Sequence, residues 1–144
     1  VEKSLRRLGT EYVDLLQIHW PDRYVPLFGG GPYDEGLERK GDVPFEEQLR
    51  AFADLQKEGK VRYFGVSNET SFGVMRFLQA AKEMDLPRII SIQNSYSLLV
   101  RAAYETDLAE VCCARNGDVG LLAYSPLAGG VLSGKYLQGD VPEG

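Results

Sequence analysis

Histidine and cysteine are scarce in this sequence of 144 residues, which contains 1 histidine and 2 cysteines. The cysteines, Cys112 and Cys113, are adjacent. Their Cα atoms therefore lie about 3.8 Å apart, closer than the roughly 4.4–6.8 Å that unstrained disulfides span. We expect neither an internal disulfide nor a metal site of cysteine and histidine ligands. Two reduced cysteines are typical of an intracellular, cytoplasmic protein, and any targeting peptide would precede Val1.

Long apolar runs and an excess of positive charge are also missing. No apolar run approaches the roughly 18 residues of a membrane span, and no secretory signal pattern opens the chain. The net charge is −5, from 16 basic and 21 acidic residues, so we expect neither a nucleic acid nor a membrane as partner. The hydrophobic share of 44% and the charged share of 26% are typical of a globular domain with its own core.

Short apolar segments alternate with amphipathic ones along the chain. Apolar runs bounded by turn residues predict buried strands at 12–20, 61–68, 88–96 and 119–127. Apolar residues at helical spacing predict helices at 44–59, 71–87 and 104–117, with Ser71 as the N-cap of the second. This β-α-β-α-β-α-β order predicts a parallel sheet covered by helices. The sheet fits either an open doubly wound fold or a barrel, and no GxGxxG motif supports a Rossmann site.

The two ends of the chain read as parts of longer elements. Residues 1–8 form the end of a helix that Gly9 closes, and residues 134–144 are rich in turn formers. We interpret the chain as an interior piece of a longer protein.

One connection, residues 21–43, is far longer than a usual loop between strand and helix. It contains three successive glycines, at 29–31, and several aromatic residues. Long loops after the carboxyl end of a strand are commonly functional. A tolerated surface insertion is the alternative, and the glycine run alone does not predict a phosphate site.

Polar or aromatic side chains stand at the carboxyl ends of all four predicted strands. They are His19 and Trp20, Ser67 and Asn68, Gln93 and Asn94, and Tyr124 and Ser125. In parallel α/β folds these ends share one edge, where the chemistry gathers. Each residue alone also fits a structural role, such as a core histidine, a helix cap or a core aromatic residue. Four strands that end in this way favour a common pocket.

The side-chain types indicate what such a pocket would bind. Histidine can donate a proton or hydrogen bond near neutral pH. Asparagine and glutamine match a carboxamide, and a tyrosine ring can stack on a heteroaromatic ring. Backbone amides in the glycine-rich segment 125–135 could surround a phosphate, with Lys135 adding charge. Together these features predict a nicotinamide dinucleotide site without a Rossmann motif.

The sequence closely resembles the aldo-keto reductases in four segments. In chain order they are LGTEYVDLLQIHWPD, GKVRYFGVSN, IQNSYSLL and AYSPLAGGVLSGKY, with the nearest look to the Tas-type branch through HWPDR and VRYFGVSNETSFGVMR. The resemblance implies a parallel (β/α)8 TIM-type barrel, of which residues 1–144 would be a single partial domain with about strands four to seven. It also implies NADPH as the cofactor and a small-molecule aldehyde or ketone as the substrate. It leaves the oligomeric state open.

The resemblance also implies a role for each strand-end residue. His19 is the catalytic histidine that hydrogen-bonds the substrate oxygen, and Trp20 and the loop 21–43 border the substrate pocket. The residues that hold the carboxamide are Ser67, Asn68 and Gln93, and Tyr124 stacks on the nicotinamide. The residues around the pyrophosphate are Ser125, Pro126, Leu127, Gly129 and Lys135.

The chain departs from the family pattern in what it omits. The family's catalytic aspartate, tyrosine and lysine stand on earlier strands, before Val1, and its adenosine-phosphate contacts stand beyond Gly144. We therefore expect little turnover from this chain alone, because such residues act as a unit. Two alternatives remain open: a cofactor-binding regulatory subunit of the ion-channel β-subunit type, and an inactive partial barrel with unpaired edges. His19 disfavours the first, since that branch typically lacks this histidine.

Overall fold

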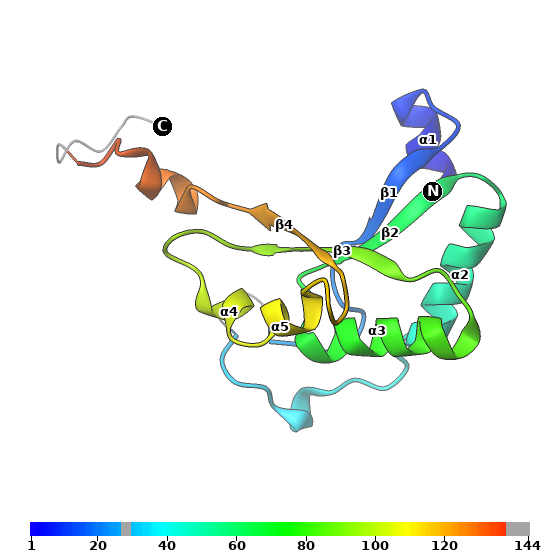
Figure 1. Cartoon of the computed structure of the whole chain (residues 1–144), viewed down its shortest axis with the longest axis horizontal. Coiled ribbons are helices and arrows are strands. Elements are labelled where there is room, and N and C mark those ends of the chain that lie inside the picture. The colour runs from blue at the N-terminus through cyan, green and yellow to red at the C-terminus, as the bar shows by residue number, and fades with distance from the viewer. Residues whose placement is uncertain (27–29, 138–144) are drawn as a thin grey trace.

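Four parallel strands form a single sheet in the computed structural model, which describes residues 1–26 and 30–137 (Figure 1). The strands are β1 (Val13–Ile18), β2 (Val61–Ser67), β3 (Ile89–Ser95) and β4 (Gly120–Tyr124). Their spatial order is β1-β2-β3-β4, the same as their order along the chain. The predicted strands and their parallel pairing are confirmed.

The helices are α1 (Glu2–Leu8), α2 (Phe45–Lys57), α3 (Ser71–Met84), α4 (Ala102–Glu105) and α5 (Leu108–Cys112), with 3-10 turns η1 (Glu35–Leu37) and η2 (Ala128–Ser133). As predicted, α1 ends at Gly9, whose left-handed backbone (φ 66°) returns its N–H to the carbonyls of Arg6 and Leu5. The predicted cap Ser71 is wrong, because the neighbouring Thr70 caps α3 by accepting from the N–H of Gly73. Within the described ranges, no helix is long and apolar enough to cross a membrane.

The predicted helix 104–117 is wrong, because α4 and α5 replace it. The break falls at Asp107, whose backbone leaves the helical region (φ −140°) while its carboxylate accepts from the N–H of Leu108 at 2.7 Å. Aspartate competes for backbone donors in this way, so it starts a new helix more readily than it continues an old one. Cys112 is buried and Cys113 half-buried, and both are free thiols, as predicted.

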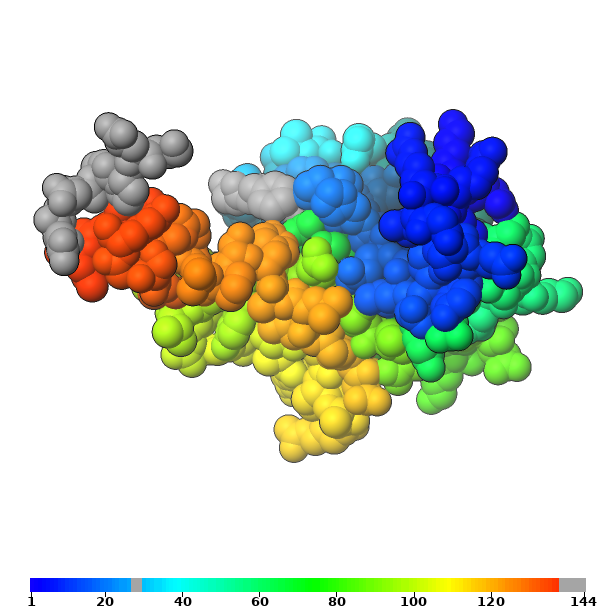
Figure 2. Space-filling model, turned by 90° about the horizontal axis from the view of Figure 1, so that it is seen from above, coloured from blue at the N-terminus to red at the C-terminus, as the bar shows by residue number. Residues whose placement is uncertain are grey.

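The hydrophobic core lies between the sheet and helices α2, α3 and α5, which share one side of it (Figure 1). Phe52 of α2 stacks on Phe64 of β2 with ring centroids 4.2 Å apart, and Phe77 of α3 meets Phe45 edge-on at 4.8 Å. Figure 2 looks onto the other side, where β1 in blue and β4 in orange lie at the surface. Doubly wound sheets carry helices on both faces and reverse their strand order, so this arrangement is that of a barrel wall.

One row across the side of the sheet opposite the core consists of small residues. Gly65, Ser91 and Gly120 are direct partners across β2, β3 and β4. A Cβ at Gly65 would collide with Ser91 Oγ and lie 3.1 Å from the Ser91 carbonyl oxygen, so only glycine permits this approach. The next step along the strands pairs Ser67 with Gln93, which brings two of the predicted site residues side by side.

Candidate active site

A hydrogen-bonded cluster centred on Asn68 joins the carboxyl ends of all four strands. Asn68 follows β2 in the left-handed region (φ 55°), which asparagine tolerates better than most residues. Its Nδ2 donates to the backbone carbonyl of His19 at 3.1 Å, and its Oδ1 accepts from the Tyr124 hydroxyl at 2.8 Å. The Asn68 N–H and the Ser67 hydroxyl both donate to the Gln93 carbonyl, at 3.0 and 2.7 Å. Four of the predicted residues, one from the end of each strand, are therefore joined by hydrogen bonds, His19 and Gln93 through their main-chain carbonyls.

Some hydrogen-bonding groups of the cluster remain available to a ligand. Asn68 Nδ2 also donates to Ser67 Oγ at 3.2 Å, so both of its hydrogens are used, while Oδ1 keeps a second lone pair. In the part of the chain that the structure describes, the half-buried Gln93 side chain has no hydrogen-bond partner. An acceptor at Asn68 and an amide at Gln93 match the donor and acceptor of a carboxamide. The residues present thus fit the nicotinamide group that the sequence predicts.

His19 and Trp20 lie at the surface beyond β1. Their rings stack with centroids 4.0 Å apart and planes 23° from parallel. Trp20 is 44% exposed. Among residues 1–26 and 30–137, no group hydrogen-bonds the imidazole nitrogens of His19. The imidazole is therefore positioned by its backbone and its neighbouring ring and is open to a hydrogen bond from outside.

The segment predicted to bind the pyrophosphate, residues 125–135, does not pack against this cluster. Ser125 directly follows Tyr124, but the chain then runs into η2, which lies beyond the end of the sheet (Figure 1). The predicted residues on this arm are Ser125, Pro126, Leu127, Gly129 and Lys135. The N–H groups of Ala128 and Gly130 donate within the arm, to Ser125 and Leu127, and the exposed Lys135 places its Nζ 4.9 Å from the Tyr136 ring centre. The assignment of these residues to phosphate stays a prediction.

A hollow of about 550 Å³ opens beside Asn68 and Tyr124, between the ends of β2 to β4 and helices α3 to α5. It is also lined by Asn94 and Ser71. Asn94 Nδ2 donates to the Glu69 carbonyl at 3.1 Å. Within the described residues, Asn94 Oδ1 and Ser71 Oγ are buried without a hydrogen-bond partner. Buried polar atoms are normally hydrogen-bonded, so these two stand out beside the hollow.

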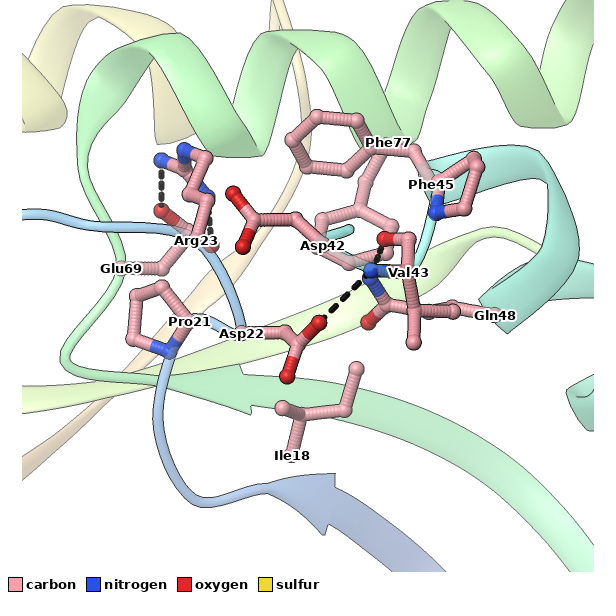
Figure 3. Close-up of a pocket in the computed structure, with 11 residues that line it drawn as sticks. Ile18, Pro21, Asp22, Arg23, Asp42, Val43, Phe45, Gln48, Glu69 and Phe77 are labelled. Atoms are coloured by element: carbon pink, nitrogen blue, oxygen red, sulfur yellow. Dashed lines mark hydrogen bonds and ion pairs between the residues drawn. The ribbon is translucent and has the colours of Figure 1, made fainter. Parts of the chain in front are cut away.

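Sequence reasoning missed an ion pair directly behind the cluster. Arg23 binds Glu69 through two hydrogen bonds, of 2.6 and 3.0 Å (Figure 3). The Glu69 side chain is only 2% exposed. The Arg23 guanidinium lies beside both the Phe45 and the Phe72 ring, 5.3 and 5.5 Å from their centres. Only the positions of the two residues in the sequence could have pointed to this pair: Glu69 directly follows Asn68, and Arg23 ends the HWPDR segment.

The loop 21–43 is tied at its base. Asp22 Oδ2 accepts from the Val43 N–H at 2.6 Å, which joins the two ends of the loop (Figure 3). The Asp22 carbonyl also accepts from Arg39 at 3.2 Å. Residues 27–29, which include the first of the three glycines, lie outside the described residues. That this loop borders a substrate pocket stays a prediction.

Comparison with known proteins places the chain in a family. Residues 1–143 match the model of the aldo/keto reductase family. The protein Tas of Escherichia coli strain K12 is 51% identical over 141 residues, which cover 98% of this chain and 40% of Tas. An aldo-keto reductase of Babesia bovis is 44% identical over 144 residues, covering 96% of this chain and 50% of that protein. A crystal structure described as "a putative 2,5-diketo-D-gluconic acid reductase B" has a TM-score of 0.67 at 28% identity, covering 94% of this chain and 39% of the other.

The chain thus spans half or less of the length of these proteins. Its four-stranded parallel sheet corresponds to part of a (β/α)8 barrel, as predicted. The family model covers nearly every residue, and the chain belongs to the aldo/keto reductase family.

Proposed function

We propose that the protein carrying this chain reduces aldehydes or ketones to alcohols with NADPH. The observation that carries this proposal is the cluster at the strand ends. Asn68 ties His19 to Tyr124, while the Gln93 side chain and the His19 imidazole stay open to ligands among the described residues. Family membership supports an oxidoreductase, and the cluster supports a nicotinamide cofactor.

Each residue of the cluster has a distinct task in this proposal. When bound, NADPH supplies the hydride. Asn68 Oδ1 accepts from the carboxamide and Gln93 completes its hydrogen bonds, so the ring has one orientation. The Tyr124 ring offers a face for stacking. The His19 imidazole donates to the carbonyl oxygen of the substrate and stabilises the charge that develops there.

The remaining tasks extend beyond the cluster. The arm from Ser125 to Lys135 is proposed to hold the pyrophosphate, and Trp20 and the loop 21–43 to border the substrate. The proton donor is proposed to be the family's tyrosine, with its lysine and aspartate, from strands that precede this chain in the relatives. Substrate binding, hydride transfer and protonation act together, so the whole native protein is the enzyme.

The test measures NADPH consumption with an aromatic aldehyde by the native protein that carries this chain. We expect His19→Ala to lower kcat and Asn68→Ala to raise the KM for NADPH. Asn116→Ala is the matched control, because Asn116 is also an asparagine that donates to a backbone carbonyl, that of Glu110, but lies on the surface away from the site. An Asn68→Ala variant that matches this control would contradict the assigned role.

The two alternatives give different results in the same protein. A regulatory subunit of the channel type would bind NADPH and associate stably with a membrane channel, yet show little turnover. An inactive partial barrel would bind no cofactor and would pair or aggregate through its sheet edges, which size exclusion with light scattering detects.

A further inference from the structure

Two short segments, residues 19–23 and 68–70, hold each other at two points. His19 accepts from the Asn68 side chain at 3.1 Å through its backbone carbonyl. Four residues later, Arg23 binds Glu69, the residue directly after Asn68. The proposed catalytic histidine and the proposed cofactor ligand therefore lie on segments joined by a hydrogen bond at one end and an ion pair at the other.

The ion pair has a well-defined geometry. Both oxygens of the Glu69 carboxylate are used: Oε2 accepts from Arg23 at 3.0 Å, and Oε1 accepts from Arg23 at 2.6 Å and from the Thr70 N–H at 2.7 Å. Arg23 also donates to the Thr70 hydroxyl at 3.0 Å. The Glu69 side chain is 2% exposed, and a buried carboxylate is costly unless it is paired and hydrogen-bonded. The two phenylalanine rings beside the guanidinium restrict its other orientations.

The backbone is anchored on both sides of Asn68. The Asn68 N–H is bonded to the Gln93 carbonyl at 3.0 Å, and the Glu69 carbonyl is bonded to Asn94 at 3.1 Å. The left-handed conformation of Asn68 (φ 55°) lies between these anchors. A shift of Glu69 would therefore turn the Asn68 amide away from His19 and Tyr124.

We propose that Arg23 is a positioning residue of the active site. Through Glu69 it holds the turn 68–70 against the segment 19–23, and so sets where the Asn68 amide stands relative to His19. The consequence for cofactor recognition rests on the proposed function. Loss of the Arg23–Glu69 pair should weaken the hydrogen bonds to the nicotinamide carboxamide, and should leave the binding of the rest of the cofactor unchanged.

Hydrogen exchange on the native protein that carries this chain tests the mechanical part without any cofactor. We expect Arg23→Gln to speed exchange of the Asn68 and Thr70 N–H groups, which the turn protects. Arg76→Gln is the matched control, because Arg76, which stands on α3, also lies beside Phe45 (5.8 Å) and also pairs with a glutamate, Glu46 at 3.3 Å. Equal exchange at residues 68 and 70 in the two variants would overturn the proposal.

Cofactor binding tests the functional part in the native protein. NADPH is compared with its 3-acetylpyridine analogue, in which a methyl ketone replaces the carboxamide and its N–H donors. We expect Arg23→Gln to weaken NADPH binding about fivefold, the scale of one hydrogen bond, with a much smaller effect on the analogue. Asn68→Ala should show the same pattern, and the double variant should be no worse than Asn68→Ala.

The outcomes separate the two proposals. Arg23→Lys keeps the cation with a single donor group and should be intermediate, and it replaces Arg23→Gln if that variant does not fold. Equal weakening of both cofactors, or additive effects in the double variant, would overturn the positioning role. Wild-type protein that binds no NADPH would overturn the proposed function, and the exchange experiment would still decide whether Arg23 holds the turn.

Discussion

Alanine at Gly73 should destabilise the fold, although alanine normally stabilises a helix. Gly73 lies in the first turn of α3, against the Arg23–Glu69 pair. A Cβ there would overlap Glu69 Cδ and Oε1 and lie 2.7 Å from Arg23 Nη2. Both side chains are held, so Glu69 has to leave the pair. Breaking a buried pair costs roughly 3–5 kcal/mol, and replacing glycine in a helix returns about 1 kcal/mol, which leaves a net loss of about 2–4 kcal/mol.

The assay is urea unfolding of Gly73→Ala and of the double variant Gly73→Ala, Glu69→Ala. Removing the Glu69 side chain removes the overlap, so in that background alanine at 73 should be neutral or stabilising by about 1 kcal/mol. The sign of the effect decides the matter. A single Gly73→Ala variant as stable as the wild type would show that the ion pair yields easily, and would refute the reasoning that it is rigid.

Three further predictions concern activity, packing and pH. The isolated chain should not measurably reduce aromatic aldehydes, because the resemblance implies that the catalytic tyrosine, lysine and aspartate lie outside it; NADPH oxidation by the chain that His19→Ala abolishes would disprove this. Gly65→Ala should lower the free energy of unfolding by about 1–3 kcal/mol through overpacking against Ser91, and Ser91→Gly should relieve part of that loss in urea unfolding. Burial raises the pKa of the Cys112 thiol above its ordinary 9.0. The unfolded chain therefore releases this proton at a lower pH than the folded chain, and the free energy of unfolding falls as the pH rises past 9.0. Cys112→Ala should flatten this decline in urea unfolding, and identical pH profiles of unfolding free energy for the two proteins would count against the prediction.

The strands and the strand-end cluster were accessible from the sequence because their causes are local. VDLLQI and VRYFGVS are apolar runs bounded by turns, and parallel strands place their carboxyl ends at one edge. His19, Asn68, Gln93 and Tyr124 therefore had to meet if the strands were right. Their roles remain predictions, but their proximity followed from topology alone.

The elements that escaped prediction depend on contacts between distant residues. Arg23 and Glu69 stand 46 positions apart, and each alone resembles an exposed charged residue. Glu69 is buried in the fold, where Phe45 of α2 and Phe72 of α3 lie beside its partner Arg23. The prediction of one continuous helix across Asp107 failed for a local reason. The apolar spacing extends through this position, but the Asp107 carboxylate accepts from the next N–H and redirects the backbone.

The hydrogen bond from Asn68 reaches the main chain of His19 and not its imidazole. Any residue other than proline offers the same carbonyl oxygen at position 19 without disturbing the strand ends. Another side chain can thus replace the imidazole without loss of the hydrogen bond that positions Asn68, the proposed cofactor ligand. Under the proposed function, one substitution at position 19 would remove the group that donates to the substrate, while the hydrogen bonds from Asn68 to the carbonyl of residue 19 and from Tyr124 to Asn68 would stay in place.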